Sequence, residues 1–336
     1  AGGAVSAETV LIHGEAGPKR GARADALQWF ADQVAERSDG DIRFDIQWGG
    51  ALFKANAAVQ SIADGVADTG SVIAVYYPQE MAGYGIADLP VNNPDAWVGM
   101  RATDELMRSS QAIQDDLADK NLVYIGTWTT SQVNIGCKGG AIKSVADISG
   151  KKVRGVGAYG KVFGEQGANM VNMSIYDAYQ GLDTGLIDCS QGYSYAVAAL
   201  KQAEVMDSYT ILDWGQVGGL GIFMNKDMHD SLTPEQQETL ASVGSDMADE
   251  FGRLITDANE KAIASMKEQG VEVITLPEED RTQLVDAGKK FLDEWVSTAD
   301  GLGLPGEKLL ADYQTLIAKY TDERDASGYP WASKTN

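Results

Sequence analysis

Residues 148–167, ISGKKVRGVGAYGKVFGEQG, contain the residue types that most directly suggest chemistry in this chain. Gly155, Gly157 and Gly160 have the GxGxxG spacing of a dinucleotide-binding turn. Such a turn follows a central parallel strand made almost entirely of Val, Ile and Leu, because both faces of the sheet are covered. Here residues 151–154 read KKVR, with a single apolar residue among three cations. The glycines therefore indicate a strand-to-helix turn with room for a ligand beside the backbone, and not a pyrophosphate site.

Arg154 ends this short charged strand, and two interpretations of it are open. An arginine on a protein surface usually forms an ion pair that contributes little to stability. However, α/β sheets place their ligand crevices at the carboxyl ends of their strands. A guanidinium can also hold a carboxylate through two charge-assisted hydrogen bonds, which the ammonium group of lysine cannot match. We therefore expect Arg154 to bind the carboxylate of a small ligand.

The composition argues against several classes of partner. The 336 residues include 27 Lys and Arg against 49 Asp and Glu, for a formal charge of −22. A surface this acidic repels phosphate backbones and anionic lipids, so we expect no nucleic-acid partner. We expect no membrane insertion either, because no segment approaches the ~20 apolar residues of a membrane span. The start, AGGAVSAETVLIHG, is typical of a mature N-terminus left after removal of a signal peptide, which predicts export.

The sequence contains no motif typical of metal, redox or nucleophilic chemistry. Cys137 and Cys189 either form one disulfide or remain two buried thiols that pack as small hydrophobic groups. With His13 and His229 as the only histidines, we expect no metal site and no cofactor. GxSxG, HExxH and Walker motifs are absent from the sequence, so we expect that the protein is not an enzyme.

Two α/β units must position Arg154. The first is predicted from strands at 9–13, 42–48 and 69–77, helices from residue 24 and at 56–67, and a longer helix at 94–118. The second is predicted from strands at 122–128, 132–138, 151–155 and 186–191, with helices at 159–167 and 174–183, and a further strand follows at 218–226. This alternation of strands and helices predicts mainly parallel sheets flanked by helices.

A long helix is predicted to span both units. Thr233 can cap it, Pro234 suits the first helical position, and the periodicity runs to Gln269. At 1.5 Å per residue this helix is about 50 Å long, which is more than the width of one small domain. We therefore expect a first lobe of residues 1–123 and about 215–255. The second lobe is expected to contain residues 124–214 and about 256–336, including the C-terminal helices, with a ligand cleft between the lobes.

Five segments, in this order, resemble a known family. They are ALQWFADQVAERSDGDIRFDIQWGGALFKANAAVQSIADGVADTGSV, IADLPV, IKSVADISGKKVRG, SIYDAYQGLDTGLIDCSQ and GIFMNKDMHDSLTPEQQETL. Over nearly its whole length the chain is similar to the extracytoplasmic solute-binding proteins of tripartite ATP-independent periplasmic (TRAP) transporters. The resemblance implies a two-lobed periplasmic protein that closes around a small organic acid and delivers it to membrane permease subunits.

The resemblance also assigns a role to Arg154, which matches the family's carboxylate-binding arginine in its VRG motif. Two departures argue against a dicarboxylate or a sialic-acid-like sugar acid. The further arginine that is often found after the YIGTW strand is missing, and Gly192 and Tyr193 stand where an asparagine is common.

Other ligand-binding residues are predicted from their positions at strand ends and at the crossing between lobes. They are Trp128, Gln191, Tyr193, Trp214, Gln216, Tyr76, Tyr77 and Glu15. For each aromatic residue, ordinary core packing is the alternative. One arginine in an aromatic slot predicts a monocarboxylate ligand, with an aromatic acid as one form of it. The alternatives to a transport role are an enzyme or a sensor ectodomain on the same two-lobed scaffold.

Overall fold

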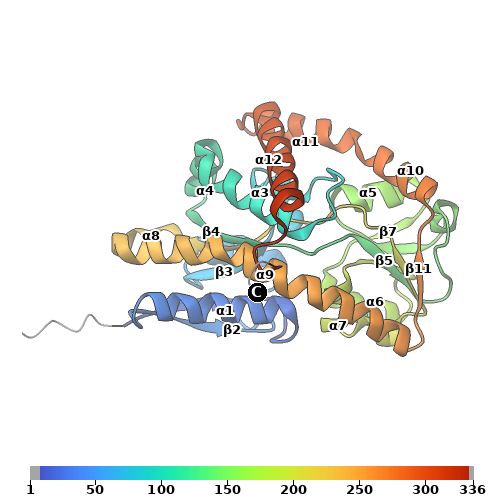
Figure 1. The fold of residues 1–336 in the computed structure, drawn as a ribbon, viewed down its shortest axis with the longest axis horizontal. Coiled ribbons are helices and arrows are strands. Elements are labelled where there is room, and N and C mark those ends of the chain that lie inside the picture. Colours follow the sequence, from blue (N-terminus) through green and yellow to red (C-terminus); the bar gives the residue numbers. More distant parts are fainter. Residues whose placement is uncertain (1–7, 333–336) are drawn as a thin grey trace, which may run out of the picture.

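A computed structural model describes residues 8–332, which form two sheets flanked by helices (Figure 1). The first sheet has the order β2-β1-β3-β10-β4 and the second has the order β11-β9-β5-β8-β6-β7. The strands of the first sheet are β1 (Thr9–Gly14), β2 (Ile42–Gln47), β3 (Thr69–Ile73), β4 (Leu122–Trp128) and β10 (Leu220–Asn225). Those of the second are β5 (Asn134–Cys137), β6 (Lys152–Arg154), β7 (Asn169–Val171), β8 (Cys189–Gly192), β9 (Ser208–Ile211) and β11 (Glu272–Thr275). Residues 1–7, which begin the predicted mature N-terminus, lie outside the described residues.

Twelve α-helices surround the sheets in residues 8–332. They are α1 (Ala22–Arg37), α2 (Ala58–Ala63), α3 (Ala96–Ser109), α4 (Gln111–Asp119), α5 (Gly157–Glu165), α6 (Ala178–Asp183), α7 (Ser194–Ala199), α8 (Lys226–Ser231), α9 (Pro234–Glu268), α10 (Glu278–Gly288), α11 (Lys290–Gly301) and α12 (Gly306–Ser327). The single helix predicted at 94–118 is two helices, because Ser110 has an extended backbone and its hydroxyl accepts a hydrogen bond from the Ile113 amide. Within the described part of the chain, no helix has both the length and the apolar character needed to cross a membrane.

Both sheets are mainly parallel, as the sequence predicts, and each contains one strand that runs in the opposite direction. Every antiparallel pair involves β5 or β10, and all other pairs are parallel. These two strands are the ones that the chain enters directly from the opposite lobe, through residues 129–133 and 212–219. A strand entered from the other lobe starts at the cleft and runs away from it, whereas β1, β3, β6 and β8 end at the cleft. The crossings therefore set the direction of β5 and β10.

The crossing segments bind each other. The Thr130 amide donates to the Val217 carbonyl at 3.1 Å, and the Val133 amide donates to the Gly215 carbonyl at 2.8 Å. Gln216 lies in the second crossing, where its amide group donates to the carbonyls of Asn93 and Asp95 at 3.1 and 2.9 Å. The connection between the lobes is therefore a paired ribbon.

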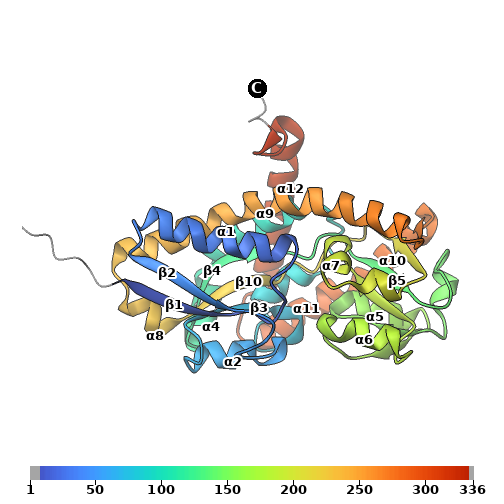
Figure 2. The same cartoon turned by 90° about the horizontal axis from the view of Figure 1, so that it is seen from below.

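Helix α9 braces both lobes, as the sequence predicts. It has 35 residues and begins with a capping box in which Thr233 and Gln236 satisfy each other's backbone amides. It packs on α1, α3 and β4 in the first lobe and on α7 and β11 in the second (Figure 2). Gly244 allows the close approach to β4, because a Cβ there would lie 2.0 Å from the Ile125 carbonyl oxygen.

Two segments lie in a different lobe from the one expected. β4 belongs to the first sheet, so the first lobe extends through Trp128 and not only to residue 123. Helix α12 packs on α3, and Trp295 of α11 and Tyr313 of α12 join the apolar cluster around Trp97 in the first lobe. The last two helices thus cover the first lobe, whereas α10 packs on α5 in the second. Amphipathic helices can cover either lobe, so periodicity alone does not decide their location.

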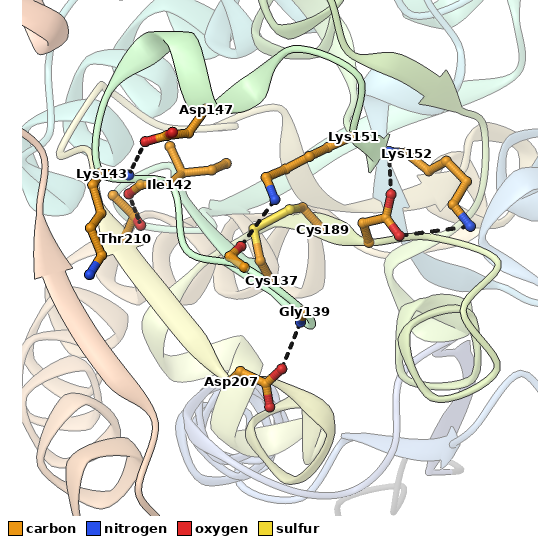
Figure 3. Close-up of a disulfide and its surroundings, with 12 residues drawn as sticks. Cys137, Gly139, Ile142, Lys143, Asp147, Lys151, Lys152, Cys189, Asp207 and Thr210 are labelled. Carbon is orange, nitrogen blue, oxygen red and sulfur yellow. Dashed lines mark hydrogen bonds and ion pairs between the residues drawn. A yellow bond between two sulfur atoms is a disulfide. The ribbon is translucent and has the colours of Figure 1, made fainter.

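Cys137 and Cys189 form a disulfide, which resolves the two alternatives left by the sequence. They occupy directly opposite positions on the neighbouring antiparallel strands β5 and β8, and both are buried. Figure 3 shows the bond near the loop in which the Gly139 amide donates to the Asp207 carboxylate at 2.6 Å. The disulfide thus joins two inner strands of the second sheet, next to the strand that ends at Arg154.

We expect the double variant Cys137→Ala/Cys189→Ala to have a lower free energy of unfolding, by roughly 4 kcal/mol for a loop of this length. Urea denaturation of the oxidised wild type and of the variant gives the difference. Adding a reductant should weaken the wild type and leave the variant unchanged. Equal midpoints for both oxidised proteins would contradict the prediction.

Asp88 is buried beside the second crossing. One carboxylate oxygen accepts the Gly219 amide at 2.7 Å, and the other, Oδ2, has no hydrogen-bond partner among residues 8–332. Burial raises the pKa of Asp88 from 3.8 to about 7, although the Gly219 hydrogen bond acts in the opposite direction. The folded protein therefore holds this proton more tightly than the unfolded chain does. The resulting contribution to stability is complete below about pH 4 and is lost as the pH rises through about 7.

We expect Asp88→Asn to remove the loss of stability that the wild type shows as the pH rises through about 7. The variant should melt several degrees above the wild type at pH 8 and within about one degree of it at pH 4. Thermal melts at the two pH values test this. Asp119→Asn, at an exposed carboxylate on α4, serves as the control. Its melting temperature should differ from that of the wild type by the same small amount at both pH values. A shift of Asp88→Asn that does not depend on pH would disprove the interpretation.

Candidate ligand-binding site between the lobes

A cavity of about 580 Å³, including its opening to solvent, lies between the lobes. Its walls are mainly aliphatic and aromatic, with Tyr76 and Trp128 from the first lobe and Tyr176, Tyr193 and Tyr195 from the second. Arg154, Arg23 and Arg20 are the charged residues that line it.

Arg154 lies at the carboxyl end of β6, where the strand turns into α5. Gly155 and Gly160 make this turn possible, since a Cβ on Gly155 would lie 2.9 Å from the Gly160 Cα. The Arg154 side chain is 1% exposed. Its Nε donates to the Met173 carbonyl and its Nη1 to the Gln191 carbonyl, each at 3.1 Å. The glycines thus act as the predicted turn, and two backbone carbonyls hold the guanidinium at the cavity.

The charge of Arg154 has no protein counter-ion. Among the residues that the structure describes, no Asp or Glu forms an ion pair with it, and its three hydrogen-bond acceptors are neutral. Only three of its five N–H groups are used by these acceptors. A buried cation without a counter-ion is unfavourable in a low dielectric. The cavity is therefore electrostatically prepared for one anionic group.

Tyr76 connects the lobes at this point. It belongs to the short 3₁₀ helix Ala74–Tyr76 that follows β3 in the first lobe. Its hydroxyl oxygen accepts hydrogen bonds from Arg154 Nη2 and from the Ile175 amide, each at 3.1 Å. These donors occupy both lone pairs, and the hydroxyl proton has no acceptor among residues 8–332. The Tyr76 hydroxyl can therefore donate to a ligand beside Arg154.

Gln191 supports this corner without lining the cavity. Its Oε1 accepts the Val156 amide at 2.9 Å, and its Nε2 donates to the Tyr193 hydroxyl at 3.0 Å. Burial is the main cause that raises the pKa of Tyr193, so this phenol stays protonated at neutral pH. Tyr193 lines the cavity, and its hydroxyl is a further neutral donor there.

A second arginine faces the cavity but is neutralised. Arg23, in the first turn of α1, lies 2.8 Å from a Glu15 carboxylate oxygen and lies over the Trp128 ring. Burial alone would lower the pKa of Arg23, but Glu15 raises it above its usual value, so the guanidinium stays charged. Glu15 also accepts hydrogen bonds from the Gly17 amide at 2.7 Å and from the Ser71 hydroxyl at 2.6 Å. Glu15 is 1% exposed and lies behind Arg23.

A family model for bacterial extracellular solute-binding proteins, family 7, matches residues 13–298. The chain belongs to this family. Its resemblance to the solute-binding proteins of TRAP transporters is thereby confirmed. One similar relative is the 2,3-diketo-L-gulonate-binding periplasmic protein of Escherichia coli K12, which is 26% identical over 278 residues, covering 81% of this chain and 82% of that protein.

Two solved TRAP solute-binding proteins share the fold, each with a TM-score of 0.83. One, from a marine metagenome, is specific for aromatic acid ligands and was crystallised with 3-hydroxybenzoate; it is 24% identical, and the match covers 94% of this chain and 99% of that one. The other, from Rhodoferax ferrireducens, contains copurified benzoate; it is 21% identical, with the same coverage.

The structure of this solute-binding protein brings four of the predicted site residues to the cavity: Arg154, Trp128, Tyr193 and Tyr76. Gln191 and Glu15 lie directly behind lining residues. Three others lie elsewhere. Tyr77 donates to the Ala55 carbonyl at 2.7 Å inside the first lobe, Gln216 holds the crossing, and Trp214 packs edge-on against Tyr159 in the second lobe.

Sequence reasoning missed Arg23, Tyr176 and Tyr195, which line the cavity. Tyr195 follows Tyr193 by two residues, and this proximity to a predicted site residue was a usable signal. Arg23 lies in the first turn of a helix, where its position resembles that of any solvent-facing cation.

Proposed function

We propose that this TRAP solute-binding protein binds a small aromatic monocarboxylate in the periplasm and delivers it to membrane permease subunits. The observation that carries the proposal is the buried Arg154 guanidinium, which has no counter-ion within residues 8–332 and faces an aromatic cavity. One carboxylate would neutralise Arg154 and use its free N–H groups. A ligand without an anionic group would leave that charge unpaired, which gives selectivity for acids.

The cavity walls support an aromatic acid over a sugar acid. Aromatic rings favour stacked or edge-on contact with another ring. Ile73, Val75 and Leu220 add aliphatic surface to the wall. Two solved proteins of the same fold contain aromatic acids, and two others contain galacturonate and glucuronate, so the choice rests on the cavity walls.

The mechanism that we propose is closure of the two lobes around the acid. Arg154 in the second lobe holds the carboxylate, and Tyr76 in the first lobe donates its hydroxyl proton to the same group. Movement of the first lobe onto the ligand completes the site and excludes water. The paired crossing segments serve as the connection about which the lobes move.

Arg154→Gln should abolish tight binding. In a thermal-shift screen, benzoate and 3-hydroxybenzoate should raise the melting temperature of the wild type more than succinate or glucuronate does. By calorimetry, benzoate should bind the variant at least thirtyfold more weakly than the wild type, which corresponds to the roughly 2 kcal/mol or more expected when a buried charge loses its partner.

Arg37→Gln is the matched control, because Arg37 is exposed at the end of α1 and pairs with Asp246 of α9. Its affinity for benzoate should equal that of the wild type. Stabilisation by succinate alone would disprove the aromatic preference, and an Arg154→Gln affinity within threefold of the wild type would disprove the role of Arg154. Conversion of the bound acid to a product would favour the enzyme alternative.

Tyr76→Phe should weaken benzoate binding by about tenfold, because it removes a donor to the carboxylate and an acceptor for Arg154. Tyr77→Phe provides a neighbouring control, since the Tyr77 hydroxyl binds the Ala55 carbonyl away from the cavity. It should lower the melting temperature but keep the affinity within twofold of the wild type. Equal loss of affinity in both variants would show that the Tyr76 hydroxyl has no special role.

A further inference from the structure

The cavity is lined by two buried guanidiniums whose electrostatic environments differ. Arg154 has only neutral acceptors, whereas Arg23 is paired with Glu15. The third lining arginine, Arg20, is exposed at the opening, where solvent screens its charge. The buried charges are therefore two positive and one negative, a net charge of +1.

His13 does not alter this sum. Its two ring nitrogens lie 2.9 Å from the Thr69 hydroxyl and 3.3 Å from the Ser71 hydroxyl, and burial lowers its pKa to about 4. The imidazole is therefore neutral at physiological pH. Because the Ser71 hydroxyl donates to Glu15, the same oxygen accepts from His13 Nε2, and His13 Nδ1 then accepts from Thr69. This buried chain of hydrogen bonds holds the Glu15 carboxylate against Arg23.

We propose that Glu15 limits the site to ligands with a single negative charge, by occupying Arg23 as a second carboxylate of the ligand would. This inference rests on the proposed binding of an aromatic monocarboxylate and extends it to the number of acidic groups that the ligand carries. Glu15 is a positioning residue, because it acts through Arg23. A dianion in the wild-type cavity would leave one negative charge unpaired in a low dielectric.

Glu15→Gln should release Arg23 with little change in shape. The glutamine Oε1 can still accept the Gly17 amide. Its Nε2 can donate to Ser71, whose hydroxyl then donates to His13 Nε2, and His13 Nδ1 donates to Thr69. Each hydrogen bond of this chain is kept, with its donor and acceptor exchanged. The net buried charge becomes +2.

The test compares benzoate with benzene-1,3- and benzene-1,4-dicarboxylate, by calorimetry on the full-length protein. The wild type should bind benzoate at least tenfold more tightly than either dicarboxylate. In Glu15→Gln, the affinity for the more tightly bound dicarboxylate, divided by the affinity for benzoate, should rise at least tenfold. The double variant Glu15→Gln/Arg23→Gln restores a net charge of +1 and should return to the wild-type preference.

The outcomes separate this inference from the proposed function. If the wild type binds benzoate but Glu15→Gln keeps the wild-type ratio, or the double variant also gains dicarboxylate binding, the role of Glu15 is disproved and the function stands. If the wild type binds neither benzoate nor the dicarboxylates, the proposed function itself fails.

If Glu15→Gln does not fold, a second variant tests the role of the net buried charge at the cavity. Arg23→Gln gives a net charge of zero, so the affinity for benzoate relative to benzamide should fall at least tenfold. A ratio within twofold of the wild type would overturn the inference.

Discussion

The site depends on one electrostatic constraint, a buried guanidinium held by neutral acceptors. Two backbone carbonyls fix the position of Arg154, and a phenol from the other lobe is its third neutral acceptor. Burying a cation without a counter-ion costs several kcal/mol, which the rest of the fold must offset. The inner strands of the second sheet are linked by a disulfide, and helix α9 braces both lobes. These features are the stable frame in which an unfavourable charge can be kept available.

The local order of strands, turns and helices could be predicted from the sequence because it depends on near neighbours. The strand that ends at Arg154, the glycine turn after it and the capped start of α9 all have local signals. The positions of α11 and α12 depend on which lobe offers a complementary apolar surface, and no local pattern encodes that choice. Strands β7 and β11 are the two edges of the second sheet and contain no buried residue, so no burial pattern marks them in the sequence.

The difference between local signals and tertiary packing also explains which residues of the site could be predicted. Residues at strand ends, such as Arg154 and Tyr193, could be predicted because parallel strands bring their carboxyl ends to one edge. Gln216 and Trp214 were also near the crossing, but the crossing segments pair with each other and turn these side chains away from the cavity. Arg23 could not be found, since its role depends on Glu15 and Trp128, which come from other elements.

The Tyr76 hydroxyl couples ligand binding to closure of the two lobes, so that each of the two favours the other. One oxygen accepts from two donors of the second lobe, while its proton has no acceptor among residues 8–332 and can be donated to a ligand. Any force that separates the lobes removes this bond and lowers the affinity, even if it never touches the ligand. A transport partner that binds both lobes from outside and holds them apart would therefore release the ligand from the site.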